Sequence, residues 1–240
     1  MAKYLDETGL AHLIAKNDDR YVRQEAGKGL SANDFTDEYK QMIDDLSYVK
    51  IAINSLTATN SSNEIGSTVA ATDVAWTLNK EPKTQKIKFS SEAEETLATS
   101  DRSKSYTGKN ITSNSIIKLT VTDERDASVS KQVTIQFQPK VYYGVSADPT
   151  ALESDAINAL TGALASSKAR TFSANAGEGE YIVYIIPSSF GTPTFNVGGF
   201  DGGFKKTKTI EHTNASGYKQ NYDIWQSVQP SLGSTSVTVK

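Results

Sequence analysis

The stretch IKLTVTDERDASVSKQVTIQF, residues 117–137, decides the fold class of this chain. Apolar residues occupy every second position near both of its ends. They are Ile117, Leu119, Val121, Val133, Ile135 and Phe137. Successive side chains of a strand point to opposite faces, so this period predicts two strands, each with one buried face. The polar run between them predicts a turn.

The same period extends upstream, at Val74, Trp76 and Leu78 and again at Ile87 and Phe89. Short half-buried strands separated by turn clusters are typical of a β-sandwich, here of about 70 residues. We therefore expect an Ig-like β-sandwich over residues 61–140. The chain contains no cysteine, so its core must rest on Trp76 and the aliphatic residues.

Residues 141–240 form a different, β-rich module with one helix. Strands are expected at 141–145, 170–174, 181–187, 207–212, 222–226 and 234–240. Tyr181–Ile186 is apolar on both faces, which predicts a central strand. The helix is expected to begin near Pro149, with Leu152, Ala156, Leu160 and Leu164 on one face. Four glycines within residues 196–204 predict a shaped loop.

The N-terminal part changes to a helical period. Residues 4–24 predict a short amphipathic helix, and a second apolar stripe follows with spacings of four and three. Its members are Phe35, Tyr39, Met42, Leu46, Val49, Ile53 and Leu56. This is the a/d pattern of a coiled coil, and it leaves two interpretations: a seam between copies of the chain, or one amphipathic helix packed on its own domain. We expect the helix to begin near Thr36 and to end at about Leu56, within a stalk assigned to residues 35–60, and a polar linker to begin at Thr57.

Composition excludes several functions. The net charge is −3 without a basic tract, so nucleic-acid binding is not expected. No apolar run is long enough to predict a membrane-inserted helix, and the N-terminus lacks the apolar core of a signal peptide. The two histidines, His12 and His212, lack the clustered ligands of a metal site. No nucleophile motif or phosphate-binding loop is present, so we expect neither an enzyme nor a cofactor.

Several segments carry a resemblance to a known family. Residues 3–16 (KYLDETGLAHLIAK) and 27–46 (GKGLSANDFTDEYKQMIDDL) resemble the N-terminal segment of tailed-bacteriophage fibre and appendage proteins. Residues 119–137 with 141–146 (VYYGVS) resemble the Ig-like domains of phage structural proteins. Residues 191–204 (GTPTFNVGGFDGGF), 213–227 and 232–239 are similar to terminal domains of the same proteins, especially from phages of gut bacteria.

The resemblance implies a virion protein assembled in the cytoplasm of the host bacterium. It implies a homotrimeric head fibre, with a tail or baseplate fibre that recognises a cell-surface glycan as the alternative. Residues 1–34 would anchor the chain to the major capsid protein or another virion protein. The anchoring side chains would be Tyr4, Leu5, Leu10, Leu13 and Ile14. Residues 35–60 would be the trimeric stalk, and the β-domains would project from it.

Aromatic residues of the last module suggest a surface that adheres to a host glycan. Tyr218, Tyr222 and Trp225 lie among Ser, Asn and Gly, and aromatic faces with polar rims suit sugars. Tyr142 and Tyr143 could extend such a surface. The alternative places these aromatic side chains in the core of the module or at an interface between subunits.

Overall fold

The computed structural model describes residues 7–18 and 37–240. Strands form 52% of the structure and helices 14%, so the expected fold class, α+β and mostly β, is confirmed. The contacts divide the chain into two units, 1–50 and Ile51–Lys240.

The first unit contributes two helices, α1 (Glu7–Asp18) and α2 (Asp37–Ser47). Acidic Asp37 and Glu38 occupy the first turn of α2, where they complement the positive end of the helix dipole. No side chain of α2 is buried. The helix ends at Ser47, well before the expected end near Leu56.

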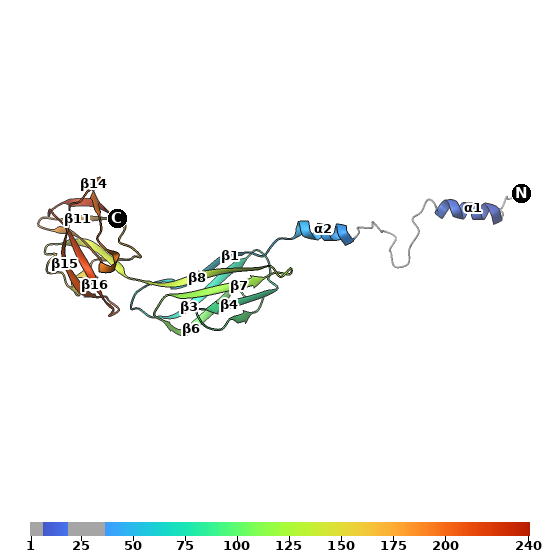
Figure 1. Ribbon diagram of the computed structural model, residues 1–240, viewed down its shortest axis with the longest axis horizontal. Helices are drawn as coiled ribbons and strands as arrows, with labels where there is room; N and C mark the ends of the chain where they lie inside the picture. Colours follow the sequence, from blue (N-terminus) through green and yellow to red (C-terminus); the bar gives the residue numbers. More distant parts are fainter. Residues whose placement is uncertain (1–6, 19–36) are drawn as a thin grey trace. The chain divides into compact units, whose positions relative to one another are not determined.

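Residues 51–138 form the first β region of the second unit, in which two sheets share one core (Figure 1). One sheet has the order β1-β3-β6 and the other β2-β8-β7-β4-β5. The strands are β1 (Ile53–Ala58), β2 (Ser62–Glu64), β3 (Val69–Leu78), β4 (Thr84–Phe89), β5 (Glu95–Leu97), β6 (Ser103–Ile111), β7 (Ser115–Thr122) and β8 (Ser128–Gln138). Trp76 is buried in this core, and its indole N–H donates to Oε1 of the buried Gln85 at 3.3 Å.

The stretch 117–137 forms the antiparallel pair β7 and β8, as its period predicts. The turn between them is organised by Asp123, a fully buried carboxylate. Its Oδ1 accepts the backbone N–H groups of Arg125 and Ala127, and its Oδ2 accepts that of Ile51 at 3.2 Å. The same side chain therefore shapes the hairpin and fixes the point at which the chain enters the β region.

Two expectations on the N-terminal side of this region were wrong. Ile53 and Leu56 do not continue the helix; they lie buried in β1, where Leu56 is opposite Trp76 across the pair with β3. The polar run after Thr57 is not a linker either, because Ser62–Glu64 forms β2 and pairs in parallel with β8. Apolar residues three apart fit a coiled-coil helix, but they also fit a strand whose burial is irregular, as in β1. The pairing of β1 with β3 selects the strand for Ile53 and Leu56.

Residues 140–240 form the second β region, with two further sheets of orders β10-β9-β12-β16-β15 and β11-β17-β13-β14. The strands are β9 (Lys140–Ser146), β10 (Thr161–Leu164), β11 (Arg170–Ala176), β12 (Tyr181–Pro187), β13 (Phe195–Val197), β14 (Phe200–Asp201), β15 (Phe204–Thr213), β16 (Lys219–Ser227) and β17 (Gly233–Val239). A short helix α3 (Ser154–Asn158) and a 3-10 turn η1 (Ser188–Phe190) complete it.

Strand β12 is central, as its sequence predicts. Ile182, Tyr184 and Ile186 belong to the core shared with the second sheet, whereas Val183 and Ile185 belong to a core on the opposite face. Both faces of the strand are thus covered, and this is why its sequence does not alternate.

The helix expected from Pro149 was mostly wrong. Only Ser154–Asn158 is helical, and Leu164 lies in β10, paired with β9. The glycine-rich segment is a shaped hairpin, in agreement with the expectation. Gly198 and Gly199 form its two-residue turn between β13 and β14, with φ values of +60° and +93° that glycine adopts without strain.

Candidate functional site

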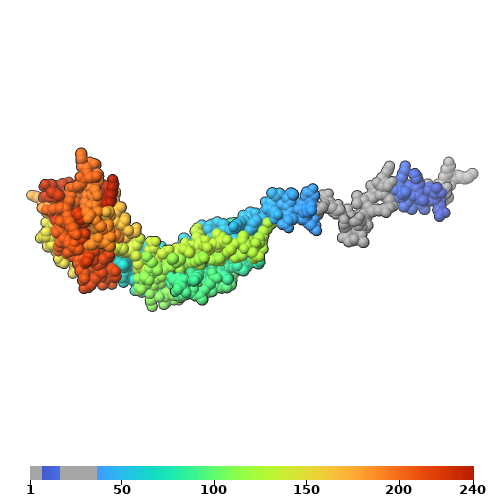
Figure 2. Space-filling view, viewed as in Figure 1, coloured from blue at the N-terminus to red at the C-terminus, as the bar shows by residue number. Residues whose placement is uncertain are grey.

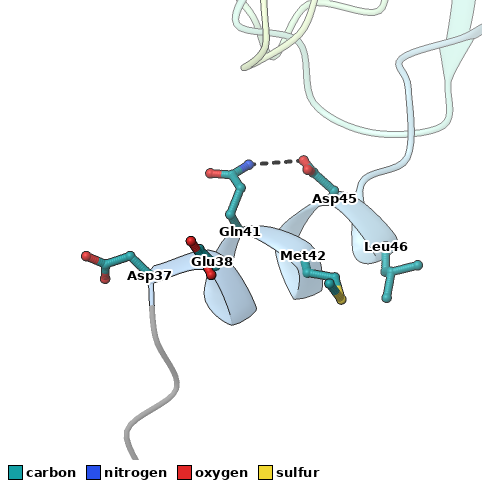
Figure 3. A pocket seen from close by; sticks show the side chains of 6 residues that line it. All are labelled: Asp37, Glu38, Gln41, Met42, Asp45 and Leu46. Atoms are coloured by element: carbon teal, nitrogen blue, oxygen red, sulfur yellow. Dashed lines mark hydrogen bonds between the residues drawn. The ribbon is translucent and has the colours of Figure 1, made fainter.

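One side of α2, together with Val49 just beyond its end, presents exposed apolar side chains. We call this set, Tyr39, Met42, Ile43, Leu46 and Val49, the α2 stripe. Each is at least half exposed, and Leu46 is 82% exposed. Figure 3 shows Met42 and Leu46 projecting together from one side of the helix, whereas Gln41 donates to Asp45 Oδ1 at 3.1 Å on another side.

The sequence predicted four of these five residues. Tyr39, Met42 and Leu46 lie in the helix at the expected seam positions, and Val49 follows two residues after its end. Ile43 was missed; it widens the stripe beside Met42. Of the remaining predicted seam residues, Ile53 and Leu56 lie in the core of the first β region, and Phe35 lies outside the described residues.

The energetics of α2 favour a partner. Helix α2 has 11 residues, and an isolated helix of that length is only marginally stable in water. The free-energy cost of nucleating the first turn is not offset by so few hydrogen bonds. Its side chains add no apolar burial, since none is buried. Covering the stripe would remove apolar area from water and stabilise the helix at the same time.

Helix α1 presents a smaller surface of the same kind. Leu10, Leu13 and Ile14 are about half exposed and lie at the spacing of one helix face. The two other residues of the expected anchor, Tyr4 and Leu5, lie outside the described residues.

The expected aromatic surface of the second β region is not assembled. Tyr222 is buried, and its hydroxyl donates to the carbonyl oxygen of Lys140 at 2.8 Å. Trp225 is half-buried and packs on Phe195, with ring centroids 5.7 Å apart. Only Tyr218 is exposed. The placement of Tyr222 in a surface was therefore wrong, because Tyr222 packs in the same core as Ile224 of β16.

A different aromatic residue is presented to solvent. Phe200, the first residue of β14, is 81% exposed. Gly198, Gly199, Gly202 and Gly203 surround it, all with positive φ. In Figures 1 and 2 the β14 hairpin projects from the second β region. The glycine pattern predicted a shaped segment, but only the three-dimensional structure distinguishes the exposed Phe200 from the half-buried Phe204.

Contacts between the two β regions cluster at the end of β2. Glu64 accepts from Lys140 Nζ at 2.7 Å and from the hydroxyl of Tyr142 at 3.4 Å. The carbonyl oxygen of Ile65 accepts from Asn214 Nδ2 at 2.7 Å. Only Pro139 separates β8 from β9, and its fixed φ limits rotation there. We call this set of contacts the joint.

Behind the joint, three buried rings pack together. His212 lies 5.2 Å from Tyr142 and 4.8 Å from Tyr222, measured between ring centroids. Its Nε2 is 3.3 Å from the Tyr142 hydroxyl, and its buried Nδ1 has no hydrogen-bond partner in the described structure. Burial lowers the pKa of His212, with the charge of Glu64 acting in the opposite sense. Burial, followed by the charge of Glu64, raises the pKa of Tyr142.

Burial favours the neutral forms of all three rings, because it disfavours their charged forms. Among residues 7–18 and 37–240, the structure brings together no group of three or more His, Asp or Glu that could hold a metal ion. Within the same ranges, no helix has the length and apolarity needed to span a membrane.

Comparison of the chain with protein-family models, with curated proteins and with solved structures gives no match. A function must therefore be inferred from the geometry of the described residues, in which the α2 stripe is exposed.

Proposed function

We propose that this chain is a structural subunit of a phage virion, a homotrimeric head fibre. Its N-terminal segment, with the exposed face of α1, would dock on the capsid or another virion protein. The α2 stripe would join three copies, and the two β regions would project from this stalk. The α2 stripe is the observation that carries the proposal.

Pairing with identical helices fits α2 better than packing on its own chain. The apolar residues of the first β region already fill a core of their own, to which Ile53 and Leu56 contribute. Tyr39, Met42, Leu46 and Val49 keep the 3-4-3 spacing of a seam. Acidic Asp45 falls at a g position and Lys50 at the next e position, where opposite charges meet between parallel helices. Trimerisation would extend the helix by less than one turn to include Val49.

We further propose that the first β region is an Ig-like sandwich. Its first, second and fourth long strands, β1, β3 and β6, lie in one sheet, and β4, β7 and β8 lie in the other. This is the division between strands A, B, E and strands C, F, G of Ig domains. The hallmark tryptophan of antibody domains lies on strand C, whereas Trp76 lies on β3 and bonds to Gln85 of β4.

The mass of the purified chain tests the self-association. Three chains of 26.0 kDa would sediment as a species of about 78 kDa. Leu46→Asp should convert it to monomer, because each copy loses about 1.5–3 kcal/mol of apolar burial and gains a charge at the seam. Ser47→Asp is the matched control. It introduces the same side chain one position further on, at an outward b position, and should leave the trimer intact.

A wild-type monomer at tens of micromolar would overturn the trimer, as would an unaltered mass for Leu46→Asp. A stable dimer would retain the role of the stripe and refute the number of copies.

Particle incorporation tests the anchoring role. Full-length chain should co-purify with virions and be labelled on the head in electron micrographs, whereas a chain lacking residues 1–30 should be a folded trimer absent from particles. Incorporation of the truncated chain would refute the anchor, and labelling of the tail would favour the second candidate.

That second candidate is a tail or baseplate fibre that recognises a host-surface glycan. The observation that favours it is Phe200, which a projecting hairpin presents to solvent. Loss of binding to host cells on Phe200→Ser, with unchanged mass and fold, would support it. Full cell binding by that variant would exclude the hairpin as the recognition element.

A further inference from the structure

The outer face of the first β region contains a hollow lined by two lysines. Six residues line it: Lys88, Ser90, Asn114, Ile116, Lys118 and Gln132. Its volume is about 390 Å³. This lies at the lower end of the range of ligand pockets, roughly 300–1,000 Å³, and is large enough for one or two sugar rings.

The strand register explains why these side chains share one face. Lys118 of β7 is directly opposite Lys88 of β4 on one side and Gln132 of β8 on the other. Their neighbours along the strands, Ile87 and Ile117, are buried in the core. Because side chains alternate between faces, the lysines and the glutamine point outward together.

The two lysines form an unfavourable pair in the absence of a ligand. Like charges directly opposite across a strand pair destabilise a sheet. The neighbouring Lys86 is compensated by Glu94 at 3.4 Å. Lys88 and Lys118 make no ion pair with any of the described residues, and no Asp or Glu lines the hollow. Only an anion from outside this set would neutralise them.

The rest of the lining supplies hydrogen bonds in fixed positions. The N–H of Ser90 donates to the carbonyl oxygen of Ile116 at 2.7 Å, and its Oγ accepts from the N–H of Ile116 at 3.3 Å, which holds this rim. Asn114 Oδ1 accepts from the N–H of Phe137 at 2.7 Å, so its amide hydrogens are left for a ligand. Ile116 adds an apolar patch and is 45% exposed.

We propose that this hollow binds an acidic saccharide, with a sugar carboxylate between Lys88 and Lys118. Cationic donors would hold the carboxylate, and the amides of Asn114 and Gln132 would bond to ring hydroxyls. Ile116 would pack on the apolar face of the ring. An acidic peptide such as poly-glutamate could use the lysines but would present no ring face to Ile116. The site lies within residues 88–132 and does not depend on the virion role or on trimerisation.

The test is calorimetric titration of the full-length chain with a galacturonic-acid oligosaccharide in about 50 mM salt. Lys88→Gln and Lys118→Gln should each weaken binding about tenfold, and the double variant should abolish it. Lys104→Gln is the matched control, because it removes the same charge from β6 in the other sheet and should change affinity less than about twofold. In addition, Lys118→Gln should raise the unfolding temperature of the ligand-free chain, because it removes the like-charge pair.

Two further probes distinguish the sources of the anion. A neutral galactose oligosaccharide should not bind, and a poly-glutamate peptide of equal charge should bind more weakly than the saccharide. Equal binding of the neutral sugar, equal or tighter binding of the peptide, or full saccharide affinity in the double variant would each overturn the proposal. Absence of saccharide binding at millimolar concentration would do the same.

Discussion

Leu56 provides the sharpest test of where the helical segment ends. As a coiled-coil d residue it would affect association, whereas in the structure it lies in β1 opposite Trp76, buried in the first core. Truncation of a buried leucine costs about 2–5 kcal/mol, from lost apolar burial and the cavity that remains. Leu56→Ala should therefore destabilise the first β region by this amount and leave the mass of the native species unchanged.

Fluorescence gives a direct readout, because the chain has two tryptophans, one in each β region. A Trp225→Phe background leaves Trp76 as the reporter of the first region. The free energy of unfolding falls by about 1–3 kcal/mol per molar urea. The urea midpoint of the transition reported by Trp76 should therefore fall by about 1 M or more.

The control is Leu46→Ala, which makes the same truncation on the exposed α2 stripe. It should shift the Trp76 midpoint by an amount equivalent to less than about 0.5 kcal/mol. Equal midpoints for the two variants, or dissociation of the native species by Leu56→Ala, would refute the placement of Leu56 in the sheet.

Three further predictions concern the second β region and the joint. Gly66→Ala should destabilise the fold by about 2 kcal/mol or more, because Gly66 has a φ of +90° and the new Cβ would lie 2.4 Å from the Cβ of Tyr218. Gly179→Ala, with a φ of +76° and no neighbour within 4 Å, should cost only about 1 kcal/mol in urea titrations. Burial lowers the pKa of His212 in the folded state below its ordinary value of 6.5. The contribution of neutral His212 to stability is therefore complete above pH 6.5 and falls as the pH drops below it. His212→Gln should make the unfolding temperature less dependent on pH in this range. Phe195→Ala should destabilise the second β region by about 3–5 kcal/mol, because Phe195 is buried, whereas Phe200→Ala should cost less than about 0.5 kcal/mol, because Phe200 is exposed. Unfolding followed by Trp225 fluorescence measures both.

Much of the β structure follows from local pattern. The alternation at Ile117, Leu119 and Val121 requires a strand with one buried face, and the apolar run Tyr181–Ile186 requires one buried on both. The alternating signal is strong because a one-residue slip would move every core side chain of such a strand to the solvent face. The N-terminal helical face of Tyr39, Met42 and Leu46 is equally local.

Where local pattern was ambiguous, tertiary contacts decided. Leu152, Leu160 and Leu164 have helical spacing, yet α3 stops at Asn158 because Thr161–Leu164 pairs with β9. Tyr222 lies in a stretch whose composition resembles a sugar-binding surface, but its side chain is buried in the core. The hollow between Lys88 and Lys118 depends on the pairing of β4 with β7, which no single segment encodes.

The sequence alone determined that this chain is mostly β, that its core forms without disulfides, and that α2 carries an apolar face. These follow from periods of a few residues, which every segment displays by itself. Only the tertiary structure decided that Ile53 and Leu56 belong to a sheet rather than a seam, and that Phe200 rather than Tyr222 meets solvent. The physical reason is that strand pairing and burial depend on partners distant in sequence, and their free energy outweighs local propensity.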